Sequence, residues 1–213
     1  SFTYRDERFS AQGPLQVEDF RLTAGFLAAP LSINRLEGTL EVLMEGGRGT
    51  VTVSGVSFLE TAFTVHNHIE GRRFEGLEIL SGFFATGELL RRLRLDGVAK
   101  RPETLKGSVT GGEVSIKRLA YAPAKPFVLE MDIRDVAFAY GKSMVEAVGG
   151  RLTLHGKNLS VADGKARIGN SSFSGVEGAT ALGGDKGLSF RARYDVDLRD
   201  LPALLSEAPR GDL

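Results

Sequence analysis

The clearest pattern in the chain is a strict alternation of apolar and polar residues between Leu188 and Leu198. Leu, Phe, Ala, Tyr and Val occupy the even positions, and Ser, Arg and Asp occupy the odd ones. In an extended strand this period of two places every apolar group on one face and every charge on the other. At about 3.3 Å per residue, such a strand would be about 36 Å long. The sequence therefore predicts one long amphipathic strand whose apolar face needs a partner.

Similar alternation recurs along the rest of the chain. One long run begins at Phe127, changes phase at Asp135 and ends at Tyr140, and another run changes phase at Gly55. A phase change of this kind is typical of a β-bulge. With the shorter runs between glycine-containing turns, about a dozen strands are expected, and no regular alternation of strand and helix interrupts them. The pattern predicts a mainly β protein built as an antiparallel meander.

Two short stretches have helical rather than strand character. Three leucines fall at helical spacing within residues 83–95, before an Asp-Gly stop. Near the end of the chain, Asp200 is placed to cap a short helix with Pro202 in its first turn. We therefore expect one or two short helices beside the sheet.

Composition excludes several classes of protein. The 213 residues include 27 Lys+Arg and 27 Asp+Glu, so the net charge is zero, which argues against nucleic-acid binding. No apolar run is long enough to span a bilayer. The chain begins at Ser1, and we expect it to be a segment of a longer protein whose membrane anchor lies outside it. We treat 1–213 as a single β-rich segment with candidate sub-repeats at 1–97 and 98–213.

His66 and His68 are the only residues that resemble a metal site. Histidines two positions apart on a strand point the same way, and neutral imidazoles bind zinc. A complete site needs further ligands, however, and the chain has one other histidine, His155, and no cysteine. Solvent-facing strand histidines are the simpler interpretation. We predict no metal and no other cofactor.

No enzyme signature is present. The glycine-rich stretch 183–187 lacks the Gly-Lys-Ser/Thr ending of a phosphate loop and precedes a strand rather than a helix. The serines at 171, 172 and 174 have no nucleophile-elbow pattern around them. The carboxylates are scattered opposite apolar positions, as expected for a solvated sheet face. The chain is therefore not expected to be an enzyme.

Two structures satisfy the alternation equally well. In a closed sandwich, two apolar sheet faces bury each other, at about 1.5–3 kcal/mol for each large side chain. In an open, curved sheet, the apolar face lines a groove for lipid. Periodicity alone does not separate these alternatives.

The C-terminal third has a recognisable internal order. A strand is followed by the step Gly169 to Gly175, a second strand, a Gly/Asp turn, the long strand 188–198 and the helix start 200–205. In this order the stretch 157–205 resembles the repeat of the AsmA-like superfamily, the AsmA, TamB and YhdP type of bacterial envelope protein. The resemblance implies a U-shaped β-groove with a hydrophobic interior and no catalytic residues.

This resemblance favours the open alternative, a curved open sheet or groove (β-taco-like). It implies a periplasmic segment, attached to the inner membrane in the full-length protein, that shields phospholipid or other acyl chains during transport between inner and outer membranes. The residues expected to line the groove are Leu188, Phe190, Tyr194, Val196, Leu198, Leu129, Met131, Ile133, Phe138, Val51, Val53 and Phe58. The alternative is an envelope-biogenesis module that binds an outer-membrane assembly protein through its sheet edges.

Overall fold

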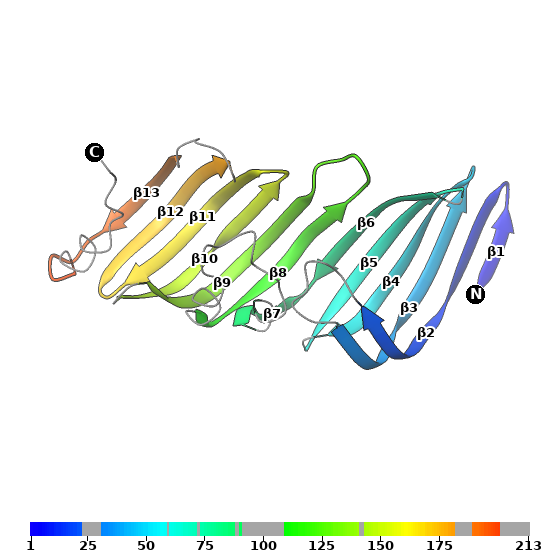
Figure 1. Cartoon of the computed structure of the whole chain (residues 1–213), viewed down its shortest axis with the longest axis horizontal. Helices are drawn as coiled ribbons and strands as arrows, with labels where there is room; N and C mark the ends of the chain where they lie inside the picture. The colour runs from blue at the N-terminus through cyan, green and yellow to red at the C-terminus, as the bar shows by residue number, and fades with distance from the viewer. Residues whose placement is uncertain are drawn as a thin grey trace.

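In the computed structural model, the chain is described over residues 1–22, 31–58, 60–71, 73–87, 90, 109–140, 143–181 and 189–200. Within these residues it forms one 13-stranded antiparallel sheet in which each strand pairs with the next along the chain, except that β6 and the short β7 both pair with β8 (Figure 1). The predicted open antiparallel meander is therefore confirmed. The strands are β1 (Phe2–Arg5), β2 (Arg8–Leu22), β3 (Leu31–Glu45), β4 (Arg48–Phe58), β5 (Thr61–Glu70), β6 (Arg73–Ser81), β7 (Phe83–Ala85), β8 (Val109–Tyr121), β9 (Val128–Tyr140), β10 (Ser143–His155), β11 (Asn158–Ile168), β12 (Ser171–Ala181) and β13 (Ser189–Asp195).

Strands β6 and β7 form one interrupted strand against β8. The pairing stops after Ile79 and resumes at Phe83 in the same register. In the interruption, the backbone N–H of Ile116 donates to Ser81 Oγ at 2.9 Å, and Ser115 Oγ donates to the Ser81 carbonyl at 2.9 Å. Two serine side chains thus replace the missing main-chain ladder and join the N-terminal strands to the C-terminal ones.

A line of β-bulges crosses strands β8 to β12. Each strand has a residue with positive φ where its register with a neighbour shifts, and β10 has a second one at Gly150 (φ 138°). A bulge bends its strand and increases its twist, so a line of them bends this part of the sheet along one crease. The residues are Gly112 (φ 95°), Asp135 (φ 50°), Ala147 (φ 50°), Asp163 (φ 52°) and Gly175 (φ 55°).

The two bulges expected from phase changes are both present. Gly55 has φ +70°, and the register of β4 with β5 shifts between Val53 and Val56. Asp135 lies where the pairing of β9 with β10 shifts. An aspartate is among the few residues other than glycine that adopt this left-handed conformation readily.

The amphipathic strand expected over 188–198 is shorter than predicted. β13 ends at Asp195, and Leu188 lies outside the described residues. After β13 the chain turns, with the backbone N–H of Asp200 donating to the Asp197 carbonyl at 2.9 Å. The N–H of Asp197 itself donates to Ser171 Oγ at 3.1 Å. The apolar-polar alternation continues through this turn, and the bond from Asp197 to Ser171 joins residues 26 positions apart, so it left no pattern in the local sequence.

The prediction of a helix over 83–95 is also wrong for the first residues of that interval. Phe83–Ala85 form β7, and only Thr86, Gly87 and Leu90 are helical among the described residues of that interval. Pairing with β8 outweighs the weak local helical preference here. The expected helix over 200–205 lies outside the described residues apart from Asp200, which belongs to the turn after β13.

The strand ends form two rims on opposite sides of the sheet. We call the rim that carries the connections at 6–7, 46–47, 71, 122–127 and 156–157 the first rim. The rim at the other ends of the same strands is the second rim.

Candidate functional site

The strand register sorts the side chains into two chemically different faces. Residues paired across antiparallel strands lie on the same face of the sheet. Following the pairs from β3 to β11 gives an unbroken row of aliphatic side chains, all half-buried. The row consists of Leu40, Val53, Val65, Ile79, Leu119, Leu129, Leu154 and Leu159. We call the face that carries this row the apolar face.

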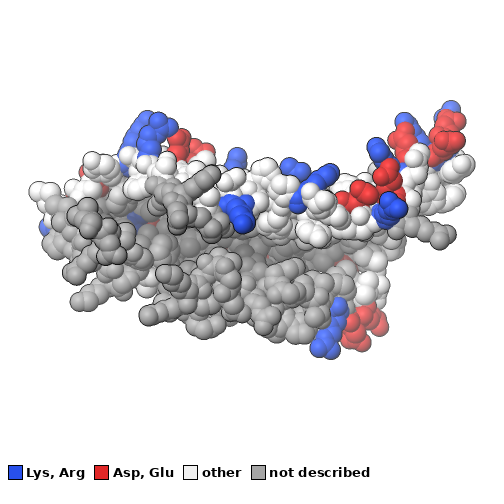
Figure 2. Space-filling view, turned by 45° about the horizontal axis from the view of Figure 1, so that its top comes forward, with Lys and Arg blue, Asp and Glu red and all other residues white. Residues whose placement is uncertain are grey.

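The opposite face carries cross-strand ion pairs, and we call it the charged face. Lys, Arg, Asp and Glu side chains gather along the upper side of the molecule in Figure 2. The pairs lie on neighbouring strands and are mostly exposed, so each contributes little to stability. They include Arg8–Glu45 (2.6 Å), Arg48–Glu70 (2.8 Å), Arg118–Glu78 (2.8 Å), Arg151–Asp132 (3.1 Å) and Arg167–Glu146 (2.7 Å).

Most residues expected to line a groove lie on the apolar face. Phe190 shares its row with Met131, through Gly178, Val161 and Leu152. The residues of the expected set that the register places on this face are Val51, Val53, Leu129, Met131, Ile133, Phe138, Phe190 and Tyr194.

Four residues of the expected set are not placed there. Val196 and Leu198 follow the end of β13, so strand alternation no longer fixes their direction. Phe58 is the last residue of β4, and its side chain lies outside the described part of the structure, as does all of Leu188.

Exposure along the apolar face changes from one rim to the other. Toward the second rim the side chains are buried: Phe84 and Val114 are each 3% exposed and Val136 is 7% exposed. Toward the first rim they are accessible: Phe74 is 42% and Tyr121 is 51% exposed. From β6 to β9, the apolar face is therefore closed by protein near the second rim and open near the first.

The closed part contains the hydrophobic core of the described chain. Phe84 of β7 packs with Val114 and Ile116 of β8, and the partly buried Phe63 and Ile133 pack against them. The ring centroids of Phe63 and Phe84 are 5.6 Å apart. The sequence concealed this cluster because Phe84 lies in the interval that has helical spacing.

The two ends of the sheet expose aromatic side chains on the apolar face. Phe2 and Tyr4 of β1 are 70% and 67% exposed, and Phe190 and Tyr194 of β13 are 70% and 73% exposed. Monomeric soluble proteins rarely leave large apolar side chains in contiguous exposed patches without a binding role. The ends of the apolar face are thus accessible to a ligand or a partner.

One polar side chain interrupts the apolar face. Asn67 of β5 lies between Val51 and Leu77 in the cross-strand register. Its Oδ1 atom is buried and has no hydrogen-bond partner. Leaving such a group unpaired costs about 1–3 kcal/mol, so the position is not explained by packing alone.

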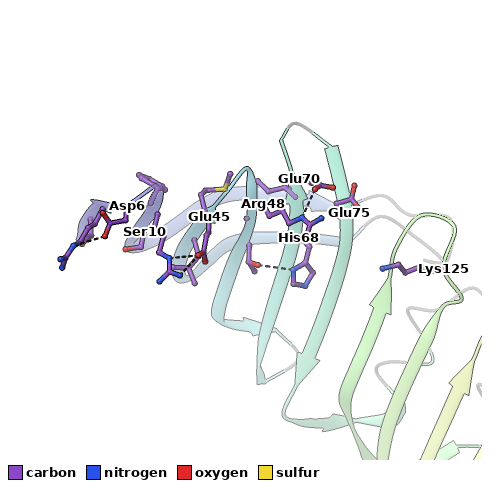
Figure 3. Close-up of a pocket in the computed structure, with 17 residues that line it drawn as sticks. Asp6, Ser10, Glu45, Arg48, His68, Glu70, Glu75 and Lys125 are labelled. Carbon is purple, nitrogen blue, oxygen red and sulfur yellow. Dashed lines mark hydrogen bonds and ion pairs between the residues drawn. The ribbon is translucent and has the colours of Figure 1, made fainter.

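A hollow of about 1140 Å³ opens at the first rim between β1 and β5 (Figure 3). Ion-paired side chains of the charged face line it, including Arg8, Glu45, Arg48 and Glu70. The Glu70 carboxylate raises the pKa of the Arg48 guanidinium, first through their hydrogen bond and then through charge attraction. The Arg48 guanidinium therefore stays charged.

The histidines considered as metal ligands lie on the charged face. His66 Nδ1 is 2.9 Å from Thr52 Oγ1, and His68 Nδ1 is 3.3 Å from Thr50 Oγ1. Each imidazole ring therefore has a threonine partner on the neighbouring strand, as is ordinary for polar residues on the solvated face of a sheet. Within the described ranges, no group of three or more His, Cys, Asp or Glu side chains is arranged to hold a metal ion.

At the second rim, hydrogen bonds to Asp200 join two segments that are distant in the sequence, and the sequence did not reveal them. We call this group of hydrogen bonds the polar staple. Asp200 Oδ2 accepts hydrogen bonds from the N–H of Asn170 (2.8 Å) and from the N–H (2.9 Å) and Oγ (2.8 Å) of Ser171. Ser171 is fully buried. Gly169 has φ +60°, and a Cβ there would lie 2.5 Å from the Asp200 carboxylate. Two separate parts of the C-terminal motif, Gly169 to Gly175 and Asp200, are therefore in direct contact.

Comparison with known proteins provides no relative. No protein-family model, curated protein or solved structure matches the chain. Among the described residues, no helix is long and apolar enough to cross a membrane. The physical character of the two faces is therefore the basis for a functional proposal.

Proposed function

We propose that this chain is a periplasmic segment of an AsmA-like envelope protein that shields phospholipid acyl chains during transport between the inner and outer membranes. The observation that carries the proposal is the half-open apolar face. An aliphatic row crosses the sheet from β3 to β11, and the same face exposes Phe74, Tyr121 and Phe190. The sequence resemblance in residues 157–205 supports the family and the location.

The mechanism is solvation of acyl chains rather than chemistry. Each methylene group moved from water onto an apolar surface contributes about 0.8 kcal/mol. The half-buried row supplies that surface, while the charges remain on the opposite face. A conduit must release its cargo, so a broad apolar strip suits transport better than a deep, closed pocket.

The open part of the face has the length of an acyl chain. From Val53 in the aliphatic row to Arg48 at the first rim is five residues, or about 17 Å at about 3.3 Å per residue. One leaflet of a bilayer has about half of the ~30 Å hydrocarbon thickness. An acyl chain lying along the strands would therefore be covered from the row to the rim.

Photo-crosslinking tests this proposal. A photoreactive amino acid replaces Phe190 on the apolar face, and in a matched variant it replaces Arg193 on the charged face of the same exposed strand. We expect lipid adducts from position 190 and few from position 193 when the chain is irradiated with phospholipid vesicles. Equal labelling at both positions, or none at 190, would contradict acyl shielding.

The second candidate, a module that binds an outer-membrane assembly protein, is favoured by one observation. β13 lies at the end of the described sheet and pairs with β12 alone. An edge strand offers a row of backbone donors and acceptors to which a partner strand can add.

A proline variant separates the two candidates. Ala192 stands opposite a register shift between β12 and β13 and has no direct partner there. Ala192→Pro should block strand addition and leave acyl shielding nearly unchanged, whereas Phe190→Asp should do the reverse. Loss of partner binding in Ala192→Pro with normal lipid capture would favour the interaction module.

A further inference from the structure

The hollow at the first rim contains an alternating series of charges. Arg8 lies on β2, Glu45 on β3, Arg48 on β4 and Glu70 on β5, and each is paired in register with the next. Neighbouring strands are about 4.8 Å apart, so the sign of the charge changes at about that interval. The series offers guanidinium and carboxylate groups side by side.

The charges in the hollow balance. Arg5 pairs with Asp6 at 3.4 Å beside the series, and Lys125 and Glu75 complete the charged lining. Lys125 approaches from the β8–β9 connection, away from the other labelled side chains (Figure 3). A site with equal numbers of positive and negative groups has no overall preference for anions.

The same hollow adjoins the open part of the apolar face. Phe9, Met44 and Ile69 are among the residues that border the hollow, and the register places their side chains across the rim on the apolar face, in one cross-strand row with Phe74. A ligand at the first rim therefore meets alternating charges and accessible apolar surface within the length of one strand end. Amphipathic lipids have this combination.

We infer that the first rim between β1 and β5 binds the headgroup of a zwitterionic phospholipid whose acyl chains lie along the strands toward the aliphatic row. This inference rests on the proposed acyl-shielding function. The lipid phosphate replaces a carboxylate partner of Arg48, since guanidinium groups bind phosphate well. The lipid ammonium group contacts the neighbouring Glu70 or Glu45.

The alternating charges select against a purely anionic headgroup. An anionic lipid gains the contact with Arg48 but places its charge beside Glu45 and Glu70 without an ammonium group to offset them. The side chains of Arg48 and Glu70 are 79% and 50% exposed, so their ion pair opens at small cost. The selectivity is accordingly modest.

A competition experiment tests the inference on the full chain. Protein is incubated with vesicles containing equal amounts of phosphatidylethanolamine and phosphatidylglycerol, and the captured lipids are quantified. We expect phosphatidylethanolamine to exceed phosphatidylglycerol by about two- to fivefold, the range that exposed ion pairs provide. Glu70→Gln should lower this ratio because Arg48 is left unpaired, and Arg48→Gln should raise it.

The control is Arg167→Gln, which removes a similar cross-strand pair with Glu146 at the second rim. The ratio of phosphatidylethanolamine to phosphatidylglycerol captured by this variant should equal that of the wild type. A wild-type ratio of one, or equal ratios for the Arg48, Glu70 and Arg167 variants, would overturn the headgroup site while lipid capture upholds acyl shielding. Absence of any captured lipid would overturn both.

Discussion

The two halves of the apolar face have the same kind of sequence and opposite environments. Near the second rim, Phe84 and Val114 are each 3% exposed and form a packed core. Near the first rim, Phe74 and Tyr121 stack on each other, with centroids 6.3 Å apart, yet stay 42% and 51% exposed. Between the bulges, apolar and polar residues alternate in both halves. Alternation therefore defines a face but does not determine whether protein covers it.

The closed half and the open half of the apolar face have different roles. Burial in the closed half stabilises the fold, because its side chains lose contact with water on folding. Side chains in the open half gain less from folding and keep surface available for a ligand. Substitutions in the closed half should therefore change stability, and substitutions in the open half should change lipid capture.

The largest expected effect is from Phe84→Ala in the closed half. Removing a buried phenyl ring leaves a cavity and should lower the free energy of unfolding by about 3–5 kcal/mol. Phe74→Ala in the open half removes the same group and should cost about 1 kcal/mol, near the mean for single substitutions. Urea denaturation followed by circular dichroism measures both. Equal losses would refute the division into closed and open halves.

A smaller effect is expected from Asp200→Ala at the second rim. The variant leaves the buried N–H and Oγ of Ser171 without their acceptor, which should cost about 1–3 kcal/mol. Asp195→Ala, at an exposed position of β13, serves as the control and should stay within about 0.5 kcal/mol of the wild type. If Asp200→Ala unfolds at the same urea concentration as the control, the staple does not hold the closed half together.

The smallest effect concerns pH at the turn after β13. The Arg199 guanidinium lowers the pKa of Asp197 through side-chain hydrogen bonds, and the Arg199 backbone N–H adds to this effect. A lowered folded-state pKa stabilises the turn above the ordinary aspartate value of about 3.9, and the contribution is lost as pH falls through the lowered value. Titration of the Asp197 carboxyl by NMR should show this, and Arg199→Gln should bring the pKa back toward the ordinary value. An Asp197 pKa unchanged by Arg199→Gln would exclude the guanidinium as the cause.

The sequence predicted the features that depend on local alternation. The bulges at Gly55 and Asp135 follow directly from phase changes, because one extra residue moves every later side chain to the other face. The apolar face was predicted in part for the same reason, with Val53, Leu129 and Phe190 placed correctly relative to the charges.

Features that depend on distant contacts could not be predicted in this way. Asp200 has the sequence position of a helix cap, but its carboxylate binds Ser171, 29 residues earlier in the chain. Phe84 lies in a stretch with leucines at helical spacing, but pairing with Val114 makes it part of a strand. The open and closed halves differ in burial, which alternation does not encode.

Quenching of a single tryptophan tests the central claim most directly, because the chain contains no tryptophan of its own. Tyr121→Trp places the fluorophore on the open apolar face, and Leu43→Trp places it on the charged face at the same rim, at a similarly exposed position of 48% against 51%. With phospholipids whose acyl chains carry bromine, we expect strong quenching at position 121 and little at position 43. Equal quenching at both positions, or none at 121, would contradict an apolar face that accepts acyl chains.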